Sequence, residues 1–415
     1  MEHERAAAAP KPPSVFSEPD FVRLWTVGIS TFTVRWLETL AISVFVYHRT
    51  ASEFPVALMM MWRVLPMALF GAFLGAWSDL VDRRLALLAI LVASSVTSLT
   101  VAALAFLQIL EIWHLGVASF VNGIAWACDN PVRRTLMGQA VGTSRLGSAM
   151  AADVGSNNAS RVLGPSLGGV LMVSTGIHGA FLCGALLYSV GVAAALGLMP
   201  RSKHQDVPAT PVLTQLLNGW REIGRNDRFR GLLIITILFN VFGWPTVSLI
   251  PVISESVLGL QPDWTGVLTG SDGAGTLVGA LLIASFAPRR YFGRLYVLGA
   301  ALFALLMGVF ATTSDSIAAV AVLLAVGLAG AGFSVMQSTL VFLAIAPSLR
   351  GAAFGLLSVC IGVSPLGLLL VGSVANLLGA ATAIKIFSVL GVLTIGSAYA
   401  AWRQVWTSDW ASSEG

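Results

Sequence analysis

Residues 71–84 read Gly71-Ala-Phe-Leu-Gly75-Ala-Trp-Ser-Asp79-Leu-Val-Asp82-Arg83-Arg84. An apolar run with two glycines four residues apart ends there in two acidic residues and a basic pair. Glycines at this spacing permit close packing between membrane helices, and Lys and Arg gather on the cytoplasmic side of such helices. The stretch therefore predicts a membrane-spanning helix whose cytoplasmic end lies at Asp79.

The composition of the whole chain is that of a membrane protein. Of its 415 residues, 56% are hydrophobic and 11% are charged, and the mean hydropathy is +0.83. A soluble domain carries roughly a quarter of its residues as charge. A spanning helix needs about 20 apolar residues, so a dozen helices would use roughly 240 of them. The chain is long enough for twelve.

Twelve apolar runs follow one another along the chain, mostly with short loops between them. Because short loops join antiparallel neighbours, we expect an all-α membrane protein with twelve transmembrane helices in two six-helix bundles. The runs cover residues 21–47, 54–78, 85–107, 113–136, 148–174, 179–199, 231–254, 264–287, 293–313, 316–346, 351–377 and 381–402.

One longer, basic connection divides the runs six and six. We expect a disordered cytoplasmic tail, an N-terminal bundle, a cytoplasmic linker, a C-terminal bundle and a second cytoplasmic tail. These regions cover residues 1–20, 21–199, 200–230, 231–402 and 403–415. Residues 1–20 are polar and acidic, unlike a cleaved signal. Within the linker, residues 212–226 are either a short amphipathic helix on the membrane surface or a solvated connection.

The distribution of basic residues predicts that both termini are cytoplasmic. If residue 1 lies there, 19 of the 24 Lys and Arg residues fall on that side, two on the other and three within helices. The cytoplasmic set is Arg5, Lys11, Arg23, Arg83, Arg84, Arg133, Arg134, Arg145, Arg201, Lys203, Arg221, Arg225, Arg228, Arg230, Arg289, Arg290, Arg294, Arg350 and Arg403. By the positive-inside rule, we expect a multi-pass protein of the cell membrane with an even number of spans.

Residue usage excludes several function classes. The chain has three lysines and none follows a glycine, so it lacks the phosphate loop of ATP-driven motors. Its five histidines and three cysteines have no zinc-binding spacing, and its basic residues do not gather as in a nucleic-acid-binding face. We expect no enzyme activity and no ATP, metal, cofactor or nucleic acid as a partner.

The two halves of the chain repeat each other's motifs. Gly71-x-x-x-Gly75 recurs as Gly275-x-x-x-Gly279, and Gly164-Pro165-Ser166-Leu167-Gly168 recurs as Ser364-Pro365-Leu366-Gly367. Both offsets are about 200 residues, as expected for transporters built from two repeated units. Glycine pairs alone also serve close packing, but two matching offsets indicate an internal repeat.

The loop at residues 71–84 resembles the G-x-x-x-D-R-x-G-R-R loop between helices two and three of the major facilitator superfamily, with Leu80 and Asp82 replacing its arginine and glycine. Gly164, Pro165, Gly168 and Gly169 resemble the helix-five motif of that superfamily's exporters. Residues 130–134, 144–146 and 346–351 are similar to its efflux branch, which includes enterobactin exporters and macrolide-efflux proteins.

This resemblance implies two six-helix bundles around a central cavity. It implies a monomer that binds a small molecule, lies in a lipid bilayer and draws energy from a proton gradient by alternating access. It also implies a conformational latch formed by Gly75, Asp79, Arg83 and Arg84, in which Asp79 meets the positive end of the helix that begins near Gly351. The alternative is a loop whose charges only fix topology.

Seven charged residues fall within predicted helices at membrane depth, where charge is costly and usually marks function. They are Arg35, Glu38, Arg63, Asp129, Asp153, Arg161 and Asp272. Glu38 and Asp272 are the candidates for proton coupling. Arg35 and Glu38 share a helical face and are expected to neutralise each other, either permanently or until an anionic cargo displaces Glu38. Asp129 stands four residues before Arg133, which predicts a structural ion pair.

A polar and glycine-rich stripe runs along the fifth predicted helix. Asp153, Asn157, Arg161, Gly164 and Gly168 recur every three or four residues and therefore share one face. Such a face avoids lipid and packs on protein or water. The substrate-cavity candidates are Arg35, Trp36, Arg63, Asn157, Arg161, Asn240, Trp244 and Gln337, which supply aromatic surface and a few polar groups.

Together these features predict a proton-coupled exporter of small amphipathic molecules, drug-like or siderophore-like. Three arginines within helices of the first half favour an acidic cargo. An importer or lipid flippase of the same fold is the alternative within transport. A receptor or scaffold that moves nothing is a further alternative, although a scaffold has little use for seven charges within helices.

Overall fold

The computed structural model describes residues 14–80, 82–142, 145–199, 226–345, 350–403 and 406. Side chains at 71–80, 130, 147 and 350–352 lie outside that description. The regular elements of the described chain are helices: η1 (Val15–Ser17), α1 (Pro19–Thr50), α2 (Glu53–Leu80), α3 (Arg83–Phe106), α4 (Ile112–Val141), α5 (Leu146–Ser174), α6 (Gly176–Leu196), α8 (Asp227–Leu238), η3 (Phe239–Gly243), η4 (Trp244–Leu249), α9 (Ile250–Ser256), α10 (Pro262–Phe286), η5 (Arg289–Tyr291), α11 (Phe292–Phe310), α12 (Ser316–Ala344), α13 (Arg350–Ile361), α14 (Ser364–Leu378) and α15 (Ala380–Ala401).

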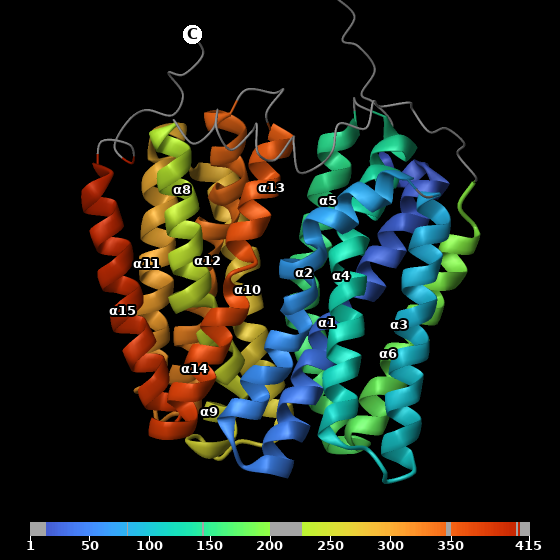
Figure 1. Cartoon of the computed structure of the whole chain (residues 1–415), viewed down its shortest axis with the longest axis horizontal. Helices are drawn as coiled ribbons and strands as arrows, with labels where there is room; N and C mark the ends of the chain where they lie inside the picture. The colour runs from blue at the N-terminus through green and yellow to red at the C-terminus, as the bar shows by residue number, and fades with distance from the viewer. Residues whose placement is uncertain are drawn as a thin grey trace, which may run out of the picture.

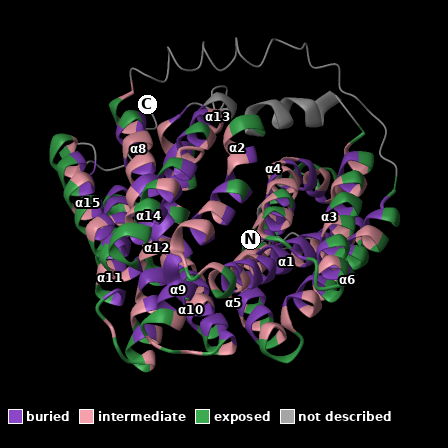
Figure 2. Cartoon of the chain, turned by 60° about the horizontal axis from the view of Figure 1, so that its bottom comes forward, coloured by how far each residue is buried: buried purple, intermediate pink, exposed green. Residues whose placement is uncertain are grey.

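These helices form two bundles that stand side by side, α1–α6 in one and α8–α15 in the other (Figures 1 and 2). In the described chain, ten helical segments are long and apolar enough to cross a membrane. The α4 and α5 helices, of 30 and 29 residues, are not among the ten. The predicted all-α membrane fold is confirmed, and the count of twelve spans stays a prediction.

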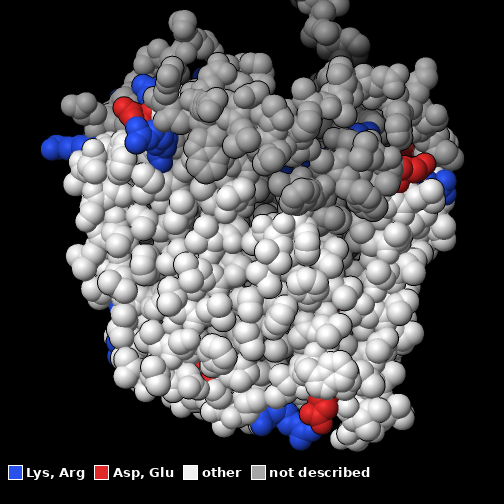
Figure 3. Space-filling model, in the orientation of Figure 1, with Lys and Arg blue, Asp and Glu red and all other residues white. Residues whose placement is uncertain are grey.

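The outer surface matches a membrane environment. On the face drawn in Figure 3, described charged side chains concentrate at the two ends of the molecule, and the band between them is almost free of charge. The most apolar window of α1 is 78% buried, whereas that of α3 is 39% buried. The α1 helix therefore lies inside its bundle, and α3 turns much of its apolar surface outward, as expected of a helix that faces lipid.

Two predicted continuous helices are broken. The run at 231–254 consists of α8, a π-helical turn η3, a 3-10 turn η4 and then α9. Pro245 and Pro251 lack the N–H that a continuous α-helix needs, which explains the change of winding. The run at 351–377 is divided at residues 362–363 between α13 and α14, directly before Pro365.

The ends of the chain are more structured than expected. Residues 14–20 were assigned to a disordered tail, but Val15 is buried in η1 and α1 begins at Pro19. Trp406 was assigned to the C-terminal tail, but its side chain is fully buried and lies next to Gly231 of α8. The predicted helix at residues 212–226 lies outside the described residues except for Asn226, which caps α8.

The two bundles contact each other mainly along two helix pairs, α5 with α10 and α2 with α14. Polar contacts join the bundles at the end opposite the termini (Figure 1), where Ser52 donates a hydrogen bond to Asn376 at 2.8 Å and His48 lies 2.9 Å from Glu255. Toward the termini, the ribbons of the two bundles diverge. The pairs α5–α10 and α2–α14 carry the repeated motifs of the sequence.

Candidate functional site

The predicted site residues fall into three places. The interior of the N-terminal bundle contains Glu38, Arg35 and Arg63. The place where α1, α5 and α10 meet contains Trp36, Asn157, Arg161 and Asp272. The interior of the C-terminal bundle contains Asn240 and Gln337. Trp244 packs against the apolar cluster of Met61, Val64 and Leu368, which joins the bundles. The structure therefore brings only part of the predicted cavity set together.

Glu38 is fully buried and is bound by side chains from three other helices. Its Oε1 accepts a hydrogen bond from Ser98 of α3 at 2.5 Å, and its Oε2 accepts one from Asn122 of α4 at 2.9 Å. The Nη2 of Arg63, from α2, lies 4.0 Å from Oε2. A buried carboxylate needs such partners, because an unpaired charge is very unfavourable in the interior.

The expected pairing of Arg35 with Glu38 is wrong. Arg35 is buried, and its guanidinium lies 4.5 Å from the ring centre of Trp126 and 5.3 Å from that of Phe32. Helical spacing places Arg35 and Glu38 on one face, but the aromatic rings hold the guanidinium by cation–π contact, while Arg63 approaches the carboxylate from another helix.

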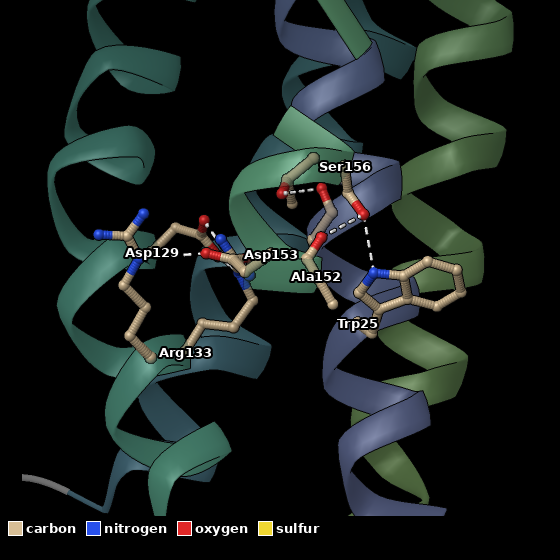
Figure 4. Close-up of polar contacts among 9 residues, drawn as sticks. Trp25, Asp129, Arg133, Ala152, Asp153 and Ser156 are labelled. Carbon is tan, nitrogen blue, oxygen red and sulfur yellow. Dashed lines mark hydrogen bonds and ion pairs between the residues drawn. The ribbon is translucent and has the colours of Figure 1, made fainter. Parts of the chain in front are cut away.

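A second buried group of charges lies between α4 and α5 (Figure 4). Arg133 donates through Nε to Asp129 at 3.2 Å and through Nη1 to Asp153, which also accepts from Arg134 at 3.1 Å. The predicted Asp129–Arg133 pair is confirmed. The Arg133 side chain is fully buried, and α4 continues beyond it to Val141. Its assignment to the cytoplasmic side stays a prediction.

Arg161 and Asp272 form an ion pair between the two bundles. The Nη2 of Arg161 on α5 donates to the Oδ2 of Asp272 on α10 at 2.5 Å. The other carboxylate oxygen, Oδ1, is buried and has no partner among the described residues. The guanidinium also lies 5.4 Å from the Trp36 ring centre. Asp272, which has no partner on its own helix, therefore finds one across the bundle boundary.

Glycines make this approach possible. A Cβ added to Gly273 would lie 2.7 Å from the backbone carbon of Arg161, and one added to Gly266 would lie 2.4 Å from the carbonyl oxygen of Pro165. These positions therefore hold α10 against α5. In contrast, Gly275 and Gly279 face Leu324 and Leu328 of α12, so the repeated glycine pair packs within the C-terminal bundle.

The helix-five motif lies between α1 and α10. Gly164 and Gly168 face the backbone of α1 near Leu37, whereas Gly169 faces the backbone of α10 at Pro262. The predicted stripe thus packs on protein and joins the two bundles through α5. Its glycines allow close helix packing, and Arg161, one turn before Gly164, supplies the positive charge of the ion pair with Asp272.

The remaining predicted cavity residues are bonded inside the C-terminal bundle. Gln337 donates to the Thr236 hydroxyl at 3.1 Å, and that hydroxyl lies 2.8 Å from the Tyr296 hydroxyl. Asn240 donates to the Thr236 carbonyl at 2.9 Å. These groups form a polar centre of the C-terminal bundle that is separate from the Arg161–Asp272 pair.

The predicted latch stays a prediction. The side chain of Asp79 lies outside the description, as do all side chains at residues 71–80. Arg84 donates to the carbonyl of Leu196 at 2.7 Å, and Asp82 caps the first turn of α3. Arg84 therefore binds within its own bundle in this structure.

Sequence reasoning missed two partners of Glu38, Ser98 and Asn122. Asn122 stands seven residues before Asp129, so Asn122, Trp126, Asp129 and Arg133 share one face of α4. That polar face was a usable signal. Ser98 had none, because serines are common in membrane helices and bond their own backbone.

Comparisons with known proteins were made after this geometry. The sequence matches the transmembrane secretion effector family over residues 11–413. It is 22% identical over 372 residues to macrolide efflux protein A of Streptococcus pyogenes, covering 86% of this chain and 90% of that protein. It is 25% identical over 255 residues to the MFS-type transporter YfiS of Bacillus subtilis, covering 60% and 59%.

Solved transporters share the fold. The structure superposes on the nucleoside transporter NupG with a TM-score of 0.71 at 16% identity, covering 92% of this chain and 99% of that one. It also superposes on an inward-facing, occupied bacterial homologue of the human lysosomal transporter Spinster with a TM-score of 0.73 at 14% identity, covering 94% and 98%.

Proposed function

Because the chain belongs to the transmembrane secretion effector family and is a membrane transporter of the major facilitator type, we propose that it exports small amphipathic molecules in exchange for protons by alternating access. The observation that carries the proposal is the Arg161–Asp272 ion pair. It joins the two bundles where they must separate if the molecule opens at the end remote from the termini. A similar protein is named for macrolide efflux, which supports outward transport of drug-like cargo.

Asp272 is well placed to couple protonation to this movement. Separating a buried ion pair leaves two uncompensated charges, which is strongly unfavourable. A proton on Asp272 removes one charge, and Arg161 is then free to bind an acidic group of the cargo. Trp36 and Asn157 offer an aromatic face and an amide beside Arg161. A cargo with both apolar surface and a polar group fits this chemistry.

Glu38 is the second candidate for proton coupling. It lies inside the N-terminal bundle, where its charge depends on Arg63, Ser98 and Asn122. A proton there alters the contacts between α1, α2, α3 and α4 without touching the bundle boundary. The two carboxylates therefore act on different parts of the cycle, and substitution of each one separates their roles.

The test is transport into inverted membrane vesicles that contain the protein and carry an imposed pH gradient. The compounds are a macrolide, a cationic dye and a catechol-bearing molecule. We expect gradient-dependent accumulation of at least one of them, abolished by a protonophore. Asp272→Asn and Glu38→Gln should each abolish accumulation against a gradient while leaving downhill exchange measurable.

Asp263→Asn is the matched control. Asp263 lies in the first turn of α10, the helix that carries Asp272, and its carboxylate accepts a hydrogen bond from the backbone N–H of Trp264. The variant should transport like the unmodified protein. Normal gradient-driven transport by both the Asp272 and the Glu38 variants would show that coupling lies elsewhere. Absence of gradient-dependent transport for all compounds would contradict the proposal.

A further inference from the structure

A small cavity is lined by residues of the N-terminal bundle. They come from α1, α2, α3, α4 and α6, and the cavity is large enough to hold a water molecule. Its polar lining includes Arg35, Arg63, Ser94, Asn122, Asp129 and Tyr188. The Arg161–Asp272 step of the proposed transport mechanism does not use this space.

The cavity is lined by buried polar atoms without partners in the described chain, two of them donors of Arg63 and the others the side-chain oxygens of Ser94 and Asn122. Arg63 is 3% exposed, and its Nε and Nη1 have no hydrogen-bond partner in the described chain. The Ser94 hydroxyl is buried and also lacks one. The Arg35 guanidinium lies over the rings of Trp126 and Phe32 and lines the same cavity as Asp129. Buried donors of this kind are costly unless a bound species accepts their hydrogen bonds.

The charges around the cavity favour an anion over water or a cation. Asp129 lines the cavity, but both of its oxygens accept from the Nε of Arg133. Glu38 has Arg63 as its nearest cation at 4.0 Å, and Arg35 has no carboxylate partner within 4.0 Å in the described chain. Three buried guanidinium groups, those of Arg35, Arg63 and Arg133, therefore balance the carboxylates of Glu38, Asp129 and Asp153. A proton on Glu38 leaves one positive charge in excess. A neutral water leaves this excess charge uncompensated in a low-dielectric interior.

We propose that this cavity binds chloride or another small monovalent anion, and that binding is stronger when Glu38 is protonated. The groups that face Glu38 and the cavity are Arg35 on α1, Arg63 on α2, Ser98 on α3, Asn122 and Asp129 on α4, and Tyr188 on α6. An ionised Glu38 competes with the anion for Arg63. A protonated Glu38 leaves Arg63 to the anion.

The proton and the anion then enter together without a change in net charge. The charges of the bundle interior then stay balanced whether or not Glu38 carries a proton. This inference does not depend on the proposed export function, because it concerns binding to the protein at rest. Its test needs no cargo and no transport.

The experiment measures equilibrium binding of radiolabelled chloride to the purified full chain in lipid nanodiscs. Gluconate, which is too large for the cavity, holds the ionic strength constant. We expect chloride to bind at least about tenfold more tightly at mildly acidic than at mildly alkaline pH, as interaction with a nearby charge implies. Equal binding at both pH values would overturn the link to Glu38.

Two variants should shift binding in opposite directions. Glu38→Gln imitates the protonated acid, so it should bind chloride tightly at both pH values. Arg63→Gln should lose binding by at least about tenfold. A misfolded variant cannot produce the gain expected of Glu38→Gln, so the pair of results is decisive.

Arg145→Gln is the matched control, because Arg145 pairs with Glu18 outside the cavity and loses the same charge. It should bind chloride like the unmodified chain. Absence of chloride binding to the unmodified chain at either pH, as for a site that holds only water, would overturn the proposal. So would unchanged binding in Arg63→Gln.

Discussion

Glu38 illustrates how one buried charge constrains its neighbours at the scale of single residues. Its carboxylate is fixed by Ser98, Asn122 and Arg63, and α6 passes directly beside it. Gly184 is the α6 residue at that crossing, and any larger side chain there meets the carboxylate. Glycine at position 184 therefore leaves the space that the Glu38 carboxylate occupies.

Replacement of Gly184 by alanine should disturb this site. The new Cβ would lie 2.8 Å from the Oε1 of Glu38 and 3.1 Å from the Cγ1 of Val34. Glu38 cannot move without losing its hydrogen bonds, so we expect a loss of roughly 1–3 kcal/mol in stability, typical of overpacking. Thermal unfolding in detergent measures the loss.

Gly396→Ala is the control for this substitution. Gly396 is exposed on α15, and no atom lies within 4 Å of an added Cβ. Alanine favours the helix there by up to about 1 kcal/mol, so the control should be neutral or stabilising. Equal stability of the Gly184→Ala variant and the unmodified chain would show that α6 does not confine Glu38.

The residue scale also shows where sequence reasoning ends. The Asp129–Arg133 pair was predictable because both residues lie on one helix face. The same reasoning paired Arg35 with Glu38 and was wrong. The nearest cation to Glu38 comes from α2 and that to Asp272 from α5. Helical periodicity cannot identify a partner that only tertiary packing brings close.

At the scale of elements, the broken span from α8 to α9 is the most informative departure from a regular helix. The carbonyl groups of Asn240 and Val241, in the π-helical turn, lie close to α14, where a Cβ added to Gly367 would meet their oxygens at 2.9 and 2.6 Å. Discontinuous helices of this kind often lie at substrate sites of transporters. Trp244 begins the 3-10 turn and packs at the bundle boundary.

Substitution of Gly367 by alanine should push α14 away from the π-helical and 3-10 turns between α8 and α9. The added Cβ would lie 2.6 Å from the Val241 carbonyl oxygen and 2.6 Å from the Cγ of Pro245. Backbone and proline atoms cannot rotate away, so we expect a stability loss of about 1–3 kcal/mol together with reduced transport. Thermal unfolding and the vesicle assay measure both.

Gly155→Ala serves as the comparison, since nothing lies within 4 Å of a Cβ at that α5 position. It should preserve stability and transport. A Gly367→Ala protein that unfolds and transports like the Gly155→Ala protein would mean that α14 need not approach the break so closely.

Hydropathy predicted the elements well and their interruptions poorly. The runs at 85–107 and 381–402 correspond to α3 and α15 within three residues at each end. The runs at 231–254 and 351–377 were expected to be continuous, although Pro245, Pro251 and Pro365 marked the breaks. Hydropathy measures the average polarity of a segment and does not register a missing backbone donor.

At the scale of the whole molecule, orientation in the membrane is the first quantity to test. The excess of basic residues on one side predicts cytoplasmic termini. Reporter domains fused after Arg84, Ser202 and Trp402 should therefore all report from the cytoplasm. A fusion after Lys385 should report from the opposite side. Opposite signals from the Arg84 and Ser202 fusions would remove the arrangement of two six-helix bundles.

Movement of one bundle relative to the other is the second property to test. A cross-link at the contact between Ser52 and Asn376 can test it. These side chains join α14 to the start of α2 at the end remote from the termini. In a background with Cys128, Cys183 and Cys360 changed to alanine, Ser52→Cys with Asn376→Cys should cross-link on oxidation. If the bundles separate here in each cycle, the cross-link should stop transport and reduction should restore it.

The matched control is a cross-link within one bundle. Ser95 of α3 and Ser189 of α6 have hydroxyl oxygens 3.2 Å apart, and both helices belong to the N-terminal bundle. Ser95→Cys with Ser189→Cys should therefore cross-link equally well and still transport, because a bundle that moves as a unit keeps this distance. Alternating access therefore requires that the cross-link between the bundles stops transport and that the cross-link within one bundle does not. Continued transport with the Ser52–Asn376 pair fully cross-linked would show that this end of the molecule does not open.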